Sequence, residues 1–102
     1  MIPGLSEASQ AFILGALAEE RKVEKAVLFG SRATGRFTAG SDVDIALLGR
    51  DLTEADRFSL ARIFDDSNLP YKIDLLILDD AVSDSLKEHI ASVGKELVLP
   101  RL

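Results

Sequence analysis

The chain has 102 residues, enough for one hydrophobic core and too few for two, so we expect a single domain over residues 1–102. Its net charge of −5 disfavours long nucleic acid as the primary ligand, because phosphate backbones are bound through cationic side chains. There is no cysteine and only one histidine, which excludes disulfides, thiolate metal centres and histidine-rich metal sites.

A small nucleotide is compatible with the negative net charge of the chain, because a bound metal ion makes the charge at the site positive whatever the net charge of the protein. No apolar run is long enough to span a membrane, and Met1 to Gly4 lack the basic and apolar regions of a signal peptide. We therefore expect a cytoplasmic protein with no membrane partner.

Helical and extended patterns alternate along the chain. The predicted helices cover residues 6–21 after a Ser6 cap, 53–67 after Thr53, and 83–93 before Gly94, with one further turn and a loop in 31–41. The predicted strands cover residues 26–29, 43–48, 71–78 and 96–99. The third strand is apolar on both faces, which predicts cover on both sides of the sheet. The alternation predicts one α/β sheet packed by helices.

A Gly-Ser pair, Gly30 and Ser31, precedes two aspartates that stand one residue apart, Asp42 and Asp44. A strand places alternate residues on one face, so both carboxylates point the same way. At an effective dielectric near 20, carboxylates about 4 Å apart repel by roughly 4 kcal/mol, so a cation is expected between them. Magnesium prefers carboxylate and phosphate oxygens, and a glycine followed by a hydroxyl lets the backbone approach a phosphate. The motif predicts a metal–nucleotide site.

Asp74 is a third carboxylate, within the apolar strand predicted over residues 71–78. We expect it to be buried and to require a metal or another partner, because an isolated buried charge is costly. If this strand neighbours strand 43–48, the three carboxylates surround a common cation. Nucleotidyl transfer uses such an arrangement, in which two metal ions stabilise the attacking and leaving oxygens and a carboxylate can accept a proton.

Three weaker motif assignments are disfavoured, two by particular residues and one by the length of the chain. Gly30 and Gly35 have P-loop spacing, but Arg36 and Phe37 stand where lysine and a hydroxyl are required. Asp42 and Asp44 open like a calcium-binding loop, yet the following residues supply neither the third ligand nor the turn glycine. An Asp-x-Asp pair also occurs in sugar-nucleotide transferases, which are usually far longer than this chain.

The segments Leu28–Ala33, Ser41–Ile45 and Ile73–Leu75 resemble the minimal nucleotidyltransferase family, small members of the DNA polymerase β-like superfamily. The resemblance covers roughly residues 23–99 and implies an α/β (α+β) fold with a small mixed sheet flanked by helices. It implies that Asp42 and Asp44 bind magnesium, with Asp74 as a further ligand or general base. Gly30 and Ser31 would hold the nucleotide triphosphate.

Arg32 and Ser41 are also assigned to the nucleotide site, whereas His89 is not. Arg32 directly follows the Gly-Ser pair, and because the site lacks a P-loop lysine we assign Arg32 to contact the phosphates. The alternative is that Arg32 is an exposed charged residue of the loop. Ser41 directly precedes the first aspartate. His89 follows Lys87 and Glu88 in the last predicted helix, and we expect a solvated residue without a catalytic role.

Stand-alone members of this family are commonly antitoxins of helical HEPN-domain ribonucleases, onto whose tyrosine they transfer AMP from ATP. The resemblance therefore implies a protein adenylyltransferase that uses ATP and two Mg²⁺ ions in a hetero-oligomer with its toxin; a homodimer is left open. One alternative is a catalytically idle antitoxin that acts by occlusion. Another is a small-molecule transferase like the aminoglycoside nucleotidyltransferases, which the missing acceptor domain disfavours. Apolar residues of the first and last helices are either core or a toxin-facing patch.

Overall fold

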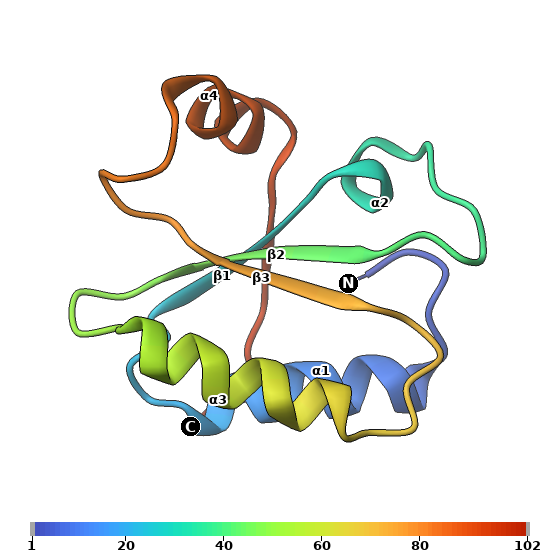
Figure 1. Ribbon diagram of the computed structural model, residues 1–102. Helices are drawn as coiled ribbons and strands as arrows, with labels where there is room; N and C mark the ends of the chain where they lie inside the picture. Colours follow the sequence, from blue (N-terminus) through green and yellow to red (C-terminus); the bar gives the residue numbers. More distant parts are fainter. Residues whose placement is uncertain (1, 102) are drawn as a thin grey trace.

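The computed structural model describes residues 2–101, which form four helices and four strands in alternation (Figure 1). The elements are α1 (Glu7–Glu19), β1 (Lys25–Phe29), α2 (Ser31–Thr34), β2 (Val43–Leu48), α3 (Glu54–Asp65), β3 (Ile73–Ile77), α4 (Asp84–Val93) and β4 (Lys95–Leu97). Every predicted element is present, and the ends differ by at most a few residues. None of these helices has the length and apolar character that crossing a membrane requires.

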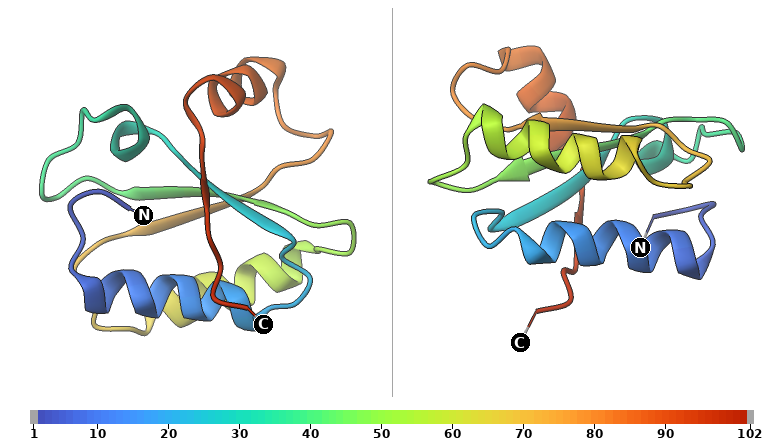
Figure 2. Two further views of the ribbon diagram at one scale, coloured as in Figure 1. Left: turned by 180° about the vertical axis from the view of Figure 1, so that it is seen from behind. Right: turned by 60° about the horizontal axis from the view of Figure 1, so that its bottom comes forward.

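The strands form one mixed sheet in the order β3-β2-β1-β4. β1 runs antiparallel to both β2 and β4, whereas β2 and β3 are parallel. Helices α1 and α3 lie on one face of the sheet, and α2 and α4 lie on the other (Figures 1 and 2). The predicted small mixed sheet flanked by helices is confirmed.

The third strand differs from the prediction. β3 is an edge strand of the sheet, and its three central residues are only partly buried, so the expected cover on both faces is incomplete. Its apolar run reflects packing of α3 against the face that bears Ile73 and Ile77.

Side chains on the two faces of the sheet have different roles because strand residues alternate in direction. The face toward α1 and α3 carries the hydrophobic core, whose strand residues include Ala26, Leu28, Val43, Ile45 and Leu47, all fully buried. The intervening residues, among them Phe29, Asp44 and Asp74, face the side of α2 and α4. Most of the hydrophobic core therefore lies on one face of the sheet, and the predicted site lies on the other.

Side chains cap the helices at their predicted starts. Ser6, Thr53 and Ser83 each accept a hydrogen bond from the backbone N–H three residues further on. The last turn of α1 contains no basic residue, and Arg101 from the C-terminal segment donates to three carbonyl groups at this end. A guanidinium at this position satisfies free carbonyls and complements the negative end of the helix dipole.

Leu47→Ala tests the position of the core. Leu47 is fully buried, so we expect the free energy of unfolding to fall by about 2 to 5 kcal/mol, from lost apolar burial and the residual cavity. Val98→Ala is the matched control, because Val98 is 83% exposed and its truncation should change stability by less than about 0.5 kcal/mol. Urea unfolding measures both variants. Equal loss in both would contradict the assigned core.

Candidate active site

Parallel pairing of β2 with β3 brings two of the predicted carboxylates together. Asp44 is the direct register partner of Asp74, so the two side chains leave neighbouring strands at the same level and on the same face. Asp42 lies immediately before β2, two residues from Asp44, and is exposed. The expectation that strands two and three are neighbours is confirmed.

Gly30 brings the backbone against Asp44. Its φ of 75° and ψ of −158° lie in a region that is essentially restricted to glycine. A Cβ atom on Gly30 would overlap the carboxylate oxygen Oδ2 of Asp44. Gly30 is also the N-cap of the short helix α2, which begins at Ser31. The Gly-Ser turn and the carboxylates therefore adjoin, and the space beside Asp44 depends on the missing side chain.

The electrostatics of the site centre on Asp44. Burial raises the pKa of the Asp44 carboxyl, and the negative charges of Asp74 and Asp42 raise it further. His89 and Lys72 act on this pKa in the opposite direction and do not cancel the rise. The site thus carries an excess of negative charge, as predicted for clustered carboxylates.

Asp74 is less buried than predicted. Its side chain is 44% exposed, because β3 is an edge strand of the sheet. The partner found within the described residues is Lys72, whose Nζ lies 3.7 Å from Oδ1 of Asp74. An exposed ion pair of this length contributes little stability, so Asp74 does not depend on a metal to remain in the fold.

The donor atoms at this site fit magnesium. They are carboxylate oxygens, the ligand type that Mg²⁺ prefers, and Gly30 leaves room beside Asp44. Within residues 2–101, no three acidic or histidine side chains are arranged to hold a metal ion as they stand. Oxygens from outside the chain are therefore needed to complete a coordination shell, and the phosphates of a nucleotide are typical donors.

Arg32 is buried inside the fold. Its guanidinium is 1% exposed and lies 5.0 Å from the ring centres of both Phe37 and Tyr71. Its nitrogens donate to the backbone carbonyl groups of Pro3, Ala39 and Ser41. This geometry joins the N-terminal segment to the loop before β2 and gives Arg32 a structural role, and its predicted contact with a phosphate stays a prediction.

Ser41 also acts within that loop. Its Oγ accepts a 2.8 Å hydrogen bond from the backbone N–H of Thr38, and its carbonyl accepts from Arg32. These contacts hold the chain directly before Asp42. The structure therefore assigns Ser41 a part in shaping the loop that leads into the site, and the predicted contact with nucleotide stays a prediction.

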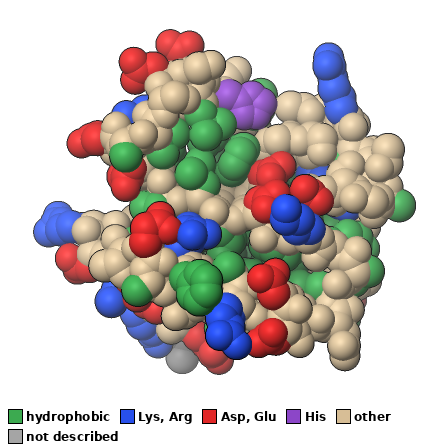
Figure 3. All heavy atoms as spheres, in the orientation of Figure 1, with side chains coloured by type: hydrophobic (Ala, Val, Ile, Leu, Met, Phe, Trp, Pro, Cys, Tyr) green, Lys and Arg blue, Asp and Glu red, His purple; other side chains and the backbone are tan. Residues whose placement is uncertain are grey.

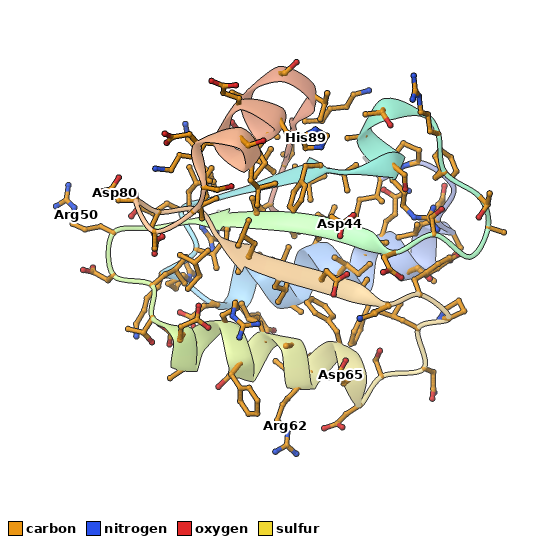
Figure 4. All side chains as sticks on the ribbon, turned by 45° about the horizontal axis from the view of Figure 1, so that its top comes forward. Asp44, Arg50, Arg62, Asp65, Asp80 and His89 are labelled. Carbon is orange, nitrogen blue, oxygen red and sulfur yellow. The ribbon has the colours of Figure 1, made fainter. Side chains whose placement is uncertain are left out.

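The sequence did not indicate that His89 adjoins the site. His89 is exposed on α4, as predicted, but its ring packs edge-on against Phe29, with centroids 6.3 Å apart and an interplanar angle of 82°. Phe29 is the register partner of Asp44 on β1. In Figure 4 the labelled His89 lies between α4 and α2, on the side of the sheet that carries Asp44. No local pattern could show this, because it depends on how α4 packs on β1.

A hollow of about 510 Å³ lies away from the carboxylates, between α1 and α3 on the other face of the sheet. Phe12 and Ile63 line it and are 43% and 46% exposed. Other apolar residues of α1, such as Ile13 and Leu17, are fully buried in the core. The first helix therefore contributes to both the core and the surface.

Comparison with known proteins identifies the class. Residues 13–100 match the family model described as polymerase beta, nucleotidyltransferase, so the chain belongs to this family. Three similar solved structures are toxin–antitoxin complexes, and their descriptions include MntA and MNT antitoxins. The predicted resemblance to the minimal nucleotidyltransferases is confirmed. No curated protein sequence matches the chain significantly.

The chain is 31% identical to one from a crystal structure of a toxin–antitoxin with AMP-PNP, covering 95% of this chain and 76% of that chain (TM-score 0.70). It is 32% identical to one from a mutant toxin–antitoxin MntA-HpeT, with coverages of 95% and 75% (TM-score 0.67). It is 28% identical to one from a structure of a tri-AMPylated Shewanella oneidensis HEPN toxin with MNT antitoxin, with coverages of 89% and 68% (TM-score 0.61).

Arg32→Ala separates a structural role from a phosphate contact. We expect the free energy of unfolding to fall by about 2 to 4 kcal/mol, because the carbonyl groups of Pro3 and Ser41 lose a charged donor whose side chain is itself buried. Arg36→Ala is the matched control, since Arg36 is an exposed arginine just after the end of α2. Urea unfolding gives the stability and calorimetry gives the affinity for nucleotide. If Arg32→Ala keeps its stability and loses affinity for nucleotide, Arg32 contacts the phosphate and the structural role is wrong.

The raised pKa of Asp44 predicts a pH-dependent stability difference. Folding favours the protonated form, so the contribution of Asp44 is present below the ordinary aspartate pKa of about 3.9 and is lost as pH rises through the folded pKa. In EDTA, Asp44→Asn should be more stable than wild type near pH 7, and this advantage should shrink toward about pH 4. Asp65→Asn, exposed on α3, is the control. Urea unfolding that shows Asp44→Asn to be the less stable protein near neutrality would contradict the assignment.

Proposed function

We propose that the chain is a magnesium-dependent adenylyltransferase that moves AMP from ATP to a tyrosine of a HEPN-type toxin, and that it acts as the cytoplasmic antitoxin. The observation that carries this proposal is Asp44 beside Asp74, with the backbone of Gly30 against Asp44. Membership of the nucleotidyltransferase family supports the reaction class. The similar structures with AMP-PNP and with a tri-AMPylated HEPN toxin support ATP as substrate and the toxin as acceptor.

The carboxylates and the Gly-Ser turn have separate tasks in this proposal. Asp42 and Asp44 would hold the metal, with Asp74 as a further ligand or as the general base, and two ions are expected for this reaction. When bound, Mg²⁺ supplies positive charge to the triphosphate as negative charge develops on the leaving group. Gly30 and Ser31 hold the triphosphate, because the absence of a side chain at Gly30 lets the phosphates approach the backbone next to Asp44.

Asp74 suits the role of proton acceptor because it is reachable. The tyrosine oxygen forms a bond to the α-phosphorus, the bond to pyrophosphate breaks, and the hydroxyl proton passes to a carboxylate. Asp74 is half-exposed at the sheet edge, on the side where an acceptor from another protein can approach. The partner would close this open face of the sheet, which accords with a hetero-oligomer of antitoxin and toxin.

Asp42→Asn and Asp44→Asn should each abolish AMP transfer while the protein stays folded, because each removes a metal-binding charge that is needed in the transition state. The assay combines the chain with a co-expressed HEPN-type toxin, labelled ATP and MgCl₂, followed by mass spectrometry of the toxin. Wild type should add about 329 Da per AMP, a value fixed by adenylyl transfer. Asp65→Asn is the control, on the opposite side of the sheet (Figure 4).

Two results would contradict the enzymatic role. Undiminished labelling by either site variant would remove the assigned mechanism. A toxin that is fully neutralised at unmodified mass, and equally well by Asp44→Asn, would establish occlusion as the means of neutralisation.

A further inference from the structure

His89 occupies the side of the site opposite the Gly-Ser turn. The turn enters α2 from the end of β1, and α4 packs on the same strand. Figure 4 shows His89 in the interval between these two helices, and Figure 3 shows its purple ring open to the surface above a group of acidic side chains. A ligand that is held by Gly30 over Asp44 therefore has His89 on its other side.

The ring of His89 is held in place from below. It packs edge-on against Phe29 at a centroid distance of 6.3 Å, and the next residue, Ile90, is buried. Phe29 is in turn the register partner of Asp44, so the ring is positioned relative to the carboxylate through one intervening side chain. Because the side chain is exposed, its nitrogens are accessible to a ligand.

The charges around Asp44 leave few groups to meet a triphosphate. Asp42 and Asp74 add negative charge, and Lys72 lies 3.7 Å from Asp74. Arg32 donates to backbone carbonyls and is buried. Within the described residues, His89 is the other group besides Lys72 that attracts the charge of Asp44. A triphosphate brings further negative charge and accepts strong hydrogen bonds from an imidazole N–H.

We propose that His89 is a nucleotide-binding residue whose ring N–H donates a hydrogen bond to the phosphate chain of ATP, while Phe29 fixes the orientation of the ring. This inference rests on the proposed function, because it requires ATP to bind between α2 and α4. It adds a side chain from the last helix to a site that the sequence motifs confine to the segments around Gly30, Asp42 and Asp74.

Two substitutions at this position separate hydrogen bonding from packing. His89→Phe keeps an aromatic ring against Phe29 and removes the donor, whereas His89→Gln keeps a donor and removes the ring. Glu88→Gln is the control, because Glu88 is the exposed neighbour on α4. The measurements are the dissociation constant of AMP-PNP with MgCl₂ by calorimetry, kcat and KM for AMP transfer, and the melting temperature of each variant.

We expect His89→Phe to bind AMP-PNP about 10- to 150-fold more weakly than wild type, the range for one lost hydrogen bond to a charged group. The KM for ATP should rise accordingly, while His89→Gln stays within a few-fold of wild type and Glu88→Gln is unchanged. Wild-type affinity in His89→Phe, or equal weakness in His89→Gln with a lowered melting temperature, would overturn the proposal. A wild-type chain that binds no AMP-PNP would instead refute the proposed function, and this inference with it.

Discussion

The parallel pairing of β2 with β3 places Asp44 directly beside Asp74, and the repulsion between these carboxylates is the constraint that the surrounding structure must accommodate. Asp44 is the more enclosed, and its pKa is raised by burial and by the neighbouring charges. Asp74 lies at the sheet edge, where water and Lys72 moderate its charge. The chain itself leaves negative charge uncompensated at this point, and in the proposed function a metal-bound nucleotide would supply the missing cation.

The two faces of the sheet separate stability from chemistry. On β2, the fully buried Ile45 and Leu47 face α1 and α3, while Asp44 faces the other side. The repulsion between the carboxylates lowers the stability of the fold, and apolar burial on the opposite face of the sheet offsets this loss. The buried Arg32 also contributes to stability. Its guanidinium donates to the carbonyl group of Ser41 in the loop before β2. This use of Arg32 increases the dependence of the site on an external cation.

Features whose cause lies within a few residues could be predicted from the sequence. Both ends of the six-residue strand β2 were predicted correctly, because polar loop residues bound an apolar run that contains one charged residue. The start of α3 was predicted because Thr53 and Asp56 form a capping box. The spacing of Gly30, Ser31, Asp42 and Asp44 was sufficient to indicate the family, since these four residues lie in two short segments of the sequence.

By itself, then, the sequence determined the order of elements, the alternation that separates core from site, and the family. Only the tertiary structure decided that β3 is an edge strand and Asp74 half-exposed, that Arg32 binds carbonyls as distant as that of Pro3, and that His89 packs against Phe29. These features depend on strand order and on how helices pack across the sheet. Both are set by burial summed over the whole core, which no local pattern of residues records.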